Sequence, residues 1–170
     1  MTTHQAYGYT FDGIEKVEGD SYQTDTLKYS FRSSKSGHHY QVRIEQYREQ
    51  LCSVKFFDDT VEVDGGKFSQ LSGTYEVRTI LRTVTDIALD ALNRRPQTSF
   101  FFIGAADERD NHRGRNRRYH VYTSFLKELG IGRRFRPVYL DGLSACLLVN
   151  TQAVDDIEAY VYRVIRFLSE

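Results

Sequence analysis

The stretch that decides the fold is Thr74–Gly104, TYEVRTILRTVTDIALDALNRRPQTSFFFIG, in which a helical pattern leads directly into a buried strand. From Thr74 to Arg94, apolar residues recur at the three- and four-residue spacing of a helix with one buried face, and Pro96 ends the pattern. Ser99–Ile103 is a short, continuous apolar run before a glycine, which is typical of a central strand buried on both faces. A helix with one apolar face beside a buried strand predicts a sheet covered by helices.

On the N-terminal side of this stretch, the chain has the two-residue period of strands. Leu27–Arg32, Tyr40–Glu45 and Cys52–Phe57 alternate apolar and polar residues, and the polar run Ser33–Gly37 supplies a turn between the first two. The alternation predicts an antiparallel meander with one face buried and the other in water.

On the C-terminal side, a second helix is expected from about Arg115 to Leu129, and a final helix from about Gln152 to Leu168. Between them, Arg134–Leu140 and Leu143–Val149 predict a hairpin, because Asp141-Gly142 supplies the positive φ angles of a tight type I′ turn.

The order of these elements predicts a single α+β domain over residues 1–170, with a mainly antiparallel sheet and about three helices packed on one face. The net charge is zero, with 23 basic and 23 acidic residues, so the overall field does not favour nucleic acid or an anionic membrane. The sequence shows no signal peptide and no apolar run long enough to span a bilayer. We therefore expect a cytoplasmic protein without a membrane partner, in which Cys52 and Cys146 are free, buried thiols.

Charge is segregated along the chain. Residues 1–75 contain 8 Lys and Arg against 11 Asp and Glu, whereas residues 104–136 contain 9 against 4. The basic part centres on RGRNRRYHVYTSFLKEL, which begins at Arg113. Four arginines within six positions indicate an anion, an acidic partner, or repulsion that other groups must relieve.

Arg115 and Tyr119 fall on the apolar stripe of the expected second helix, at its N-terminal end. Free N–H groups at such a helix start favour an anion, so an anion-binding site is predicted from Arg115 and Tyr119 with Arg113 and Arg118. The alternative is that Arg115 only ties down the preceding loop by pairing with one of its carboxylates, Asp107, Glu108 or Asp110.

Two histidines, His112 and His120, flank this segment and are the candidates for acid or base chemistry. With Arg and Tyr to stabilise a phosphate, they would suit a metal-independent phosphodiester cleavage. The sequence contains no histidine or cysteine pair at a metal-ligand spacing and no phosphate or dinucleotide loop, so no metal and no cofactor are predicted.

Three stretches, TYEVRTILRTVTDIALDAL, SFFFIGAADE and RGRNRRYHVY, together resemble an uncharacterised family of bacterial and phage proteins, a domain of unknown function. The likeness covers Tyr29–Val149, with ILRTV at Ile80–Val84, and Arg115 and Tyr119 match an Arg-xxx-Tyr helix start. Arg118 departs from the pattern, because it stands where an apolar residue is expected. The resemblance implies the fold and no activity.

Three functions follow as alternatives. The first is a small interaction domain that is not an enzyme and binds an anionic group, a protein carboxylate or a nucleic-acid phosphate, near Arg115. The second is a metal-independent nuclease of the toxin type that uses His112 and His120. The third is a homo-oligomeric structural or inhibitory protein without an anion site.

Overall fold

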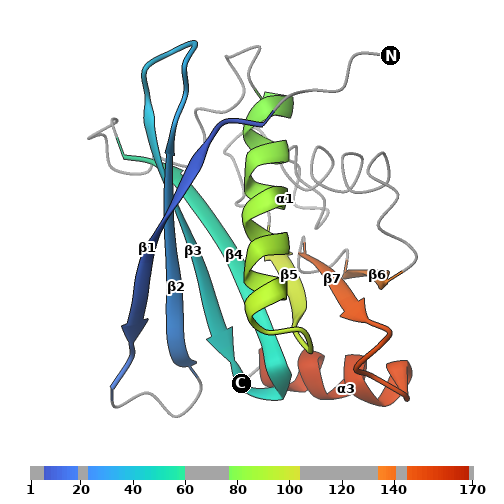
Figure 1. Ribbon diagram of the computed structural model, residues 1–170. Coiled ribbons are helices and arrows are strands. Elements are labelled where there is room, and N and C mark those ends of the chain that lie inside the picture. The colour runs from blue at the N-terminus through green and yellow to red at the C-terminus, as the bar shows by residue number, and fades with distance from the viewer. Residues whose placement is uncertain (1–5, 19–22, 60–76, 104–133, 141–144, 169–170) are drawn as a thin grey trace, which may run out of the picture.

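The structure, a computed structural model, describes residues 6–18, 23–59, 77–103, 134–140 and 145–168 (Figure 1). Its centre is a seven-stranded sheet in the order β1-β2-β3-β4-β5-β7-β6. The strands are β1 (Tyr9–Lys16), β2 (Gln23–Arg32), β3 (His39–Tyr47), β4 (Leu51–Asp58), β5 (Ser99–Ile103), β6 (Phe135–Leu140) and β7 (Ala145–Asn150). Two α-helices are described, α1 (Val77–Arg94) and α3 (Ile157–Leu168), and a short 3₁₀ turn, Arg48–Gln50, joins β3 to β4.

The sheet is mainly antiparallel, as predicted. Strands β1 to β4 form a meander, and β5, β7 and β6 pair antiparallel with one another. The exception is the parallel pair β4 and β5, on either side of α1 in the chain. A parallel pair needs a crossover of this kind, since its strands run in one direction. Strand β5 is central and has the predicted bounds, Ser99–Ile103.

The prediction that the helices pack on one face of the sheet was wrong. Helix α1 packs on one face, called here the α1 face, where its Ile80, Val84 and Ile87 join a core with alternate residues of β2, β3 and β4. Helix α3 packs on the opposite face, the α3 face, where Tyr160 and Val164 are buried with a second apolar cluster: Leu51, Phe101, Leu147 and Val149. Strands β5 and β7 are apolar on both faces, which is why the sheet needs a helix on each side here.

The ends of several elements differ from their predicted positions. The predicted strands of the meander are each one to four residues longer at one or both ends. Helix α3 begins at Ile157 and not at Gln152, because the Asp156 carboxylate accepts a hydrogen bond from the Ala159 backbone N–H (3.1 Å) and so caps the helix there. The predicted helix at 115–129 lies outside the described residues.

The C-terminal hairpin forms, but with a different register from the predicted one. Leu140 pairs with Ala145, so the pairing is centred between residues 142 and 143, one position later than a tight turn at Asp141-Gly142 requires. At the other end of the hairpin, Phe135 pairs with Asn150, a buried residue whose hydrogen bonds hold this register.

Strand β1 was not expected from the sequence. Its burial is slight, and a β-bulge interrupts its pairing with β2 between Phe11 and Gly13, where Gly13 has a φ of 122°. Only a residue without a side chain adopts that backbone angle readily. The bulge breaks the apolar–polar alternation from which strands are predicted.

The two cysteines lie in the core as free thiols, as predicted. Burial raises the pKa of Cys52 to about 12, with smaller contributions from neighbouring charges, so this thiol is protonated at neutral pH. None of the described helices combines the length and the apolarity that crossing a bilayer requires.

A partly buried group of hydrogen-bonded side chains ties β2 to α1 and should make the stability of the fold depend on pH in the acidic range. The Tyr29 hydroxyl donates to Asp90 Oδ2 (2.7 Å), and Arg94 Nε donates to the same oxygen (3.0 Å). Burial acts to raise the pKa of Asp90, but the two hydrogen bonds outweigh it, and the pKa lies below its ordinary value.

Because the pKa of Asp90 is lowered by folding, its contribution to stability is present above the unfolded pKa, about 3.9, and is lost as pH falls through the folded pKa. We expect Asp90→Asn to lower stability at neutral pH and to flatten the decline in Tm below about pH 4. Tyr29→Phe removes one of the two hydrogen bonds to Asp90 and should flatten the decline in Tm less than Asp90→Asn does. Thermal unfolding followed by circular dichroism from pH 7 to pH 2 measures both. A decline in Asp90→Asn as steep as in the unsubstituted protein would contradict the prediction.

Candidate functional site

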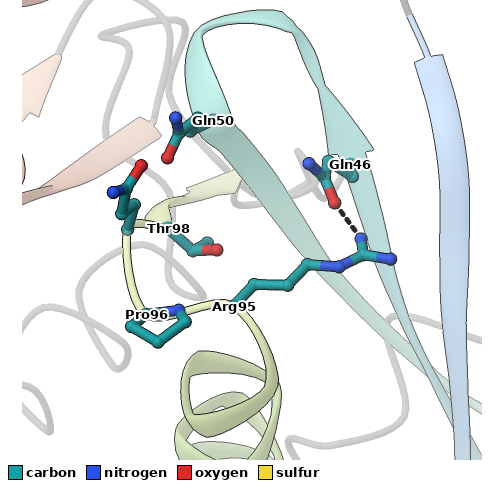
Figure 2. A pocket seen from close by; sticks show the side chains of 6 residues that line it. Gln46, Gln50, Arg95, Pro96 and Thr98 are labelled. Atoms are coloured by element: carbon teal, nitrogen blue, oxygen red, sulfur yellow. Dashed lines mark hydrogen bonds between the residues drawn. The ribbon is translucent and has the colours of Figure 1, made fainter.

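The candidate site is a pocket of about 480 Å³ at the end of the sheet where β3 turns into β4, called here the end pocket. Two segments that are distant in sequence build it: the end of β3 with the turn that follows, and the connection from α1 to β5 (Figure 2). Its lining residues are Gln46, Gln50, Arg95, Pro96, Gln97 and Thr98.

Arg95 is held in place by a two-pronged ion pair with Asp25 on β2. Its two terminal nitrogens donate to the two carboxylate oxygens at 2.7 Å each, and the side chains of Arg95 and Asp25 are only 26% and 20% exposed. The guanidinium also donates to the Gln46 side-chain oxygen, and Figure 2 shows Arg95 reaching from the end of α1 toward this amide. The ion pair with Asp25 balances the positive charge of Arg95. Because the oxygen of the Gln46 amide accepts from Arg95, the NH₂ group is the part of this amide that remains as a donor.

Asn150, at the end of β7, holds the connection that forms one wall of the pocket. This side chain is fully buried, and its Nδ2 donates to the backbone carbonyls of Pro96 (2.9 Å) and Thr98 (3.1 Å). Its Oδ1 accepts from the Gln152 N–H (3.1 Å), and its own N–H donates to Ser99 Oγ (2.9 Å). One amide therefore satisfies backbone groups from two connections at once.

The turn that carries Gln50 has an uncommon backbone. Glu49 and Gln50 have φ angles of 63° and 53°, in the left-handed region that residues with side chains seldom occupy. Such a conformation costs on the order of 1 kcal/mol or more per residue and persists only when the surroundings impose it.

Helix α3 imposes that backbone. The hydroxyl of the buried Tyr160 donates to the Glu49 carbonyl (2.9 Å), and Arg163 Nε pairs with the Glu49 carboxylate (3.2 Å). Burial raises the pKa of Tyr160, so the hydroxyl remains a donor at neutral pH. Contacts from α3 therefore hold the turn in place. The Gln50 side chain lines the end pocket and also a second pocket beside it.

The second pocket, called here the α3 pocket, has a volume of about 360 Å³ and shares Gln50 and Gln97 with the end pocket. Its other lining residues come from the turn, from the connection between β7 and α3, and from α3 itself: Glu49, Ala153, Val154, Asp155, Asp156, Tyr160 and Arg163. The two pockets are thus neighbours with two glutamine side chains at their boundary.

The end pocket is equipped for hydrogen bonding. Each glutamine amide offers two N–H donors and one acceptor oxygen. Gln50 and Gln97 are exposed, and no hydrogen bond to the rest of the described chain occupies their side chains. Because Asp25 neutralises Arg95, the lining residues that the structure describes present amides and no uncompensated charge, which suits a polar, uncharged ligand group.

The residues predicted as sites from the sequence are not among those that the structure describes. Arg113, Arg115, Arg118 and Tyr119, like His112 and His120, are outside the described residues, so the structure does not test them. Among residues 6–18, 23–59, 77–103, 134–140 and 145–168, no three His, Cys, Asp or Glu side chains converge as metal ligands.

A base-stacking surface on the sheet would need exposed tyrosine rings. Tyr29 and Tyr40 are 1% and 4% exposed on the α1 face, and Tyr47 is half-buried against the apolar cluster of the α3 face, so these tyrosines cover the sheet.

Sequence reasoning missed the residues of the end pocket. The position of Arg95 in the sequence indicates only a cation that complements the C-terminal end of the preceding helix, whereas its main partner, Asp25, is 70 residues away. The one local signal is the run RRPQTS after α1, in which Pro96 marks the end of the helix and polar residues follow.

No protein-family model, no curated protein and no solved structure matches this chain. The resemblance to the uncharacterised bacterial and phage family stays a prediction, and the function has to be inferred from the site itself.

Proposed function

We propose that this protein is a small interaction domain that binds an extended segment of a partner polypeptide at the end pocket, through hydrogen bonds to the partner's amide groups. The observation that carries the proposal is the lining of three glutamine amides around a guanidinium whose charge is already balanced by Asp25. A polypeptide offers N–H donors and C=O acceptors at regular intervals, which glutamine amides match in both senses.

The way in which the walls of the pocket are held supports the proposal that the pocket binds a ligand. The Asp25–Arg95 ion pair and the hydrogen bonds of Asn150 hold the walls of the pocket in place. The exposed amides of Gln50 and Gln97 therefore belong to an ordered backbone. A binding site whose backbone is ordered before the ligand binds lowers the entropy cost of association. The strained turn at Glu49 and Gln50 is consistent with this, since backbone strain concentrates at ligand-binding positions.

The arginine-rich segment from Arg113 to Tyr119 remains the predicted anion-binding part of the same interaction domain, with a protein carboxylate or a nucleic-acid phosphate as its ligand. Fluorescence anisotropy with single-stranded RNA and DNA at two salt concentrations tests the nucleic-acid form. Intact labelled RNA after incubation with the protein would remove the nuclease alternative based on His112 and His120.

The end pocket can be tested by NMR on the full chain labelled with ¹⁵N. The probe is N-acetyl-glutamine N-methylamide, an uncharged molecule with three amide groups, and inorganic phosphate serves as the anionic comparison. We expect the probe to shift the side-chain NH₂ signals of Gln46, Gln50 and Gln97 in a saturable way. Gln50→Ala should weaken binding about fivefold, the effect of one lost hydrogen bond worth about 1 kcal/mol.

The matched control is Gln41→Ala. Gln41 is also on β3, and its side chain donates to Asp59 (2.9 Å), outside the lining of the end pocket. Unchanged binding in this variant shows that the effect is local. Phosphate shifting the three NH₂ signals while the amide probe leaves them unmoved would overturn the proposal in favour of an anion site.

A further inference from the structure

The two edges of the sheet differ in how well they are protected against pairing. Strand β6 forms one edge and contains Pro137, which has no N–H to donate, so this edge is poorly suited to adding a strand. Strand β1 forms the other edge and is eight residues long without a proline. Among the described strands it pairs only with β2, so alternate backbone N–H and C=O groups along its outer side point away from the described sheet, where another strand could pair with them.

The bulge in β1 sets which side chains share a face. Tyr9, Phe11 and Ile14 pair with Phe31, Tyr29 and Leu27, which all belong to the core of the α1 face. Phe11 and Ile14 are three positions apart and would lie on opposite faces of a regular strand, but the extra residue, Asp12, brings them to the same face. Lys16 joins them, and Thr10 and Glu15 share the other face.

This arrangement makes β1 self-complementary. We propose that two copies of the chain associate through their β1 strands, antiparallel, about a twofold axis between Asp12 and Gly13. Tyr9 then stands opposite Lys16 of the other copy, Thr10 opposite Glu15, and Phe11 opposite Ile14, so every one of these pairs lies on a common face.

The chemistry of these pairs favours a second copy as the occupant. Phe11 is half-buried and packs against the core, while Ile14 is 54% exposed and Tyr9 37% exposed, so pairing covers apolar surface that water now contacts. Lys16 meets an aromatic ring and Glu15 meets a hydroxyl, which avoids like charges in direct opposition. The same axis keeps α1 of both copies on one side of a continuous sheet.

The association is expected to be weak, because two eight-residue strands bury less than the 1,600 Å² or so of a standard interface. Sedimentation velocity of the full chain from about 10 to 500 µM should show a shift from monomer toward dimer. Ile14→Lys should weaken the dimer about tenfold or more, because a lysine on an edge strand resists pairing. Its control is Tyr162→Lys on α3, at a side chain that is 68% exposed and far from β1 in the fold, which should dimerise like the unsubstituted protein.

The register is tested by mixed cysteine variants. Directly opposite residues of antiparallel strands have Cα atoms about 4.5–5.5 Å apart, within the range of a disulfide. Mixing Thr10→Cys with Glu15→Cys under mild oxidation should give a crosslinked dimer, whereas either variant alone should not, since identical residues would lie about 17 Å apart. Thr10→Cys mixed with Lys16→Cys is the control for the face. Cys52 and Cys146 are buried and take no part.

Each possible result of these experiments either supports or contradicts the proposed dimer. A concentration-dependent dimer that Ile14→Lys weakens and that crosslinks only in the Thr10–Glu15 mixture supports the proposal. A monomer at every concentration overturns it, including the case in which a strand of a different protein is the true occupant of this edge. A dimer that Ile14→Lys leaves intact, or equal crosslinking in the control mixture, overturns it too. None of these outcomes depends on the end pocket.

Discussion

Asn150→Ala is expected to lower the free energy of unfolding by about 3–5 kcal/mol, the largest effect among the substitutions considered. Asn150 is fully buried, and alanine would leave the carbonyls of Pro96 and Thr98 and the N–H of Gln152 without the Asn150 side chain as a partner. Each buried group left unsatisfied costs about 1–3 kcal/mol. The total free energy of unfolding of a domain of this size is about 5–15 kcal/mol. Unfolding of Asn150→Ala by urea should therefore have a clearly lower midpoint than that of the unsubstituted protein.

Two further variants identify the cause. Asn150→Asp keeps the size and the Oδ1 acceptor but removes both N–H donors and adds a charge, so it should destabilise at least as much. Thr151→Ala removes an exposed hydroxyl that donates to the Arg134 carbonyl (2.8 Å), and should cost about 1 kcal/mol or less. An Asn150→Asp protein as stable as the unsubstituted one would refute the hydrogen-bonding explanation.

Arg95→Leu should be the second most damaging substitution, at about 2–3 kcal/mol. Leucine would leave the Asp25 carboxylate without its two-pronged donor and the Gln46 oxygen without its partner, in surroundings where Asp25 is only 20% exposed. The same change should abolish the ordered wall of the end pocket, so binding of the amide probe should fall together with stability.

Arg82→Leu is the matched control, because it makes the same substitution at an ion pair within α1 that is more exposed than the Arg95–Asp25 pair. Arg82 lies 3.3 Å from Asp86, four residues along α1, and is 43% exposed. Such pairs contribute about 0.5 kcal/mol or less. A double-mutant cycle of Asp25→Asn with Arg95→Leu isolates the coupling of the pair, and a coupling near zero would show that the two side chains act independently.

The parts of the fold that could be predicted are those whose signal is local. The helical stripe of α1, the apolar run of β5 and the alternation of β2, β3 and β4 each occupy a continuous stretch, and each of these elements is present. Strand β1 has no such signal, because its bulge disrupts the alternation and its edge position requires little apolar surface.

The position of α3 could not be predicted for a different reason. An apolar stripe shows that a helix packs on something, but it does not show which face of a sheet it covers. The sign in the sequence that both faces need cover is the nearly continuous apolar run of β7, whose six residues are all buried in the structure.

The end pocket was beyond sequence reasoning because its contacts join residues that are far apart in the chain. Arg95 meets Asp25 across 70 positions, Asn150 meets Pro96 across 54, and Tyr160 meets Glu49 across 111. No spacing rule connects such pairs. The arginine-rich segment attracted attention because its charges are adjacent in sequence, whereas the arginine of the end pocket is identified by its partners in space.

The parallel junction of β4 and β5 has a consequence for how the chain folds. Its register consists of three residue pairs, starting with Leu51 and Ser99, whereas the meander on one side is joined by successive hairpins. Contacts between nearby residues form early, and a pairing that must close a long loop forms late. We therefore expect the meander to form first during folding, and the pairing of β4 with β5 to form late and to limit the folding rate.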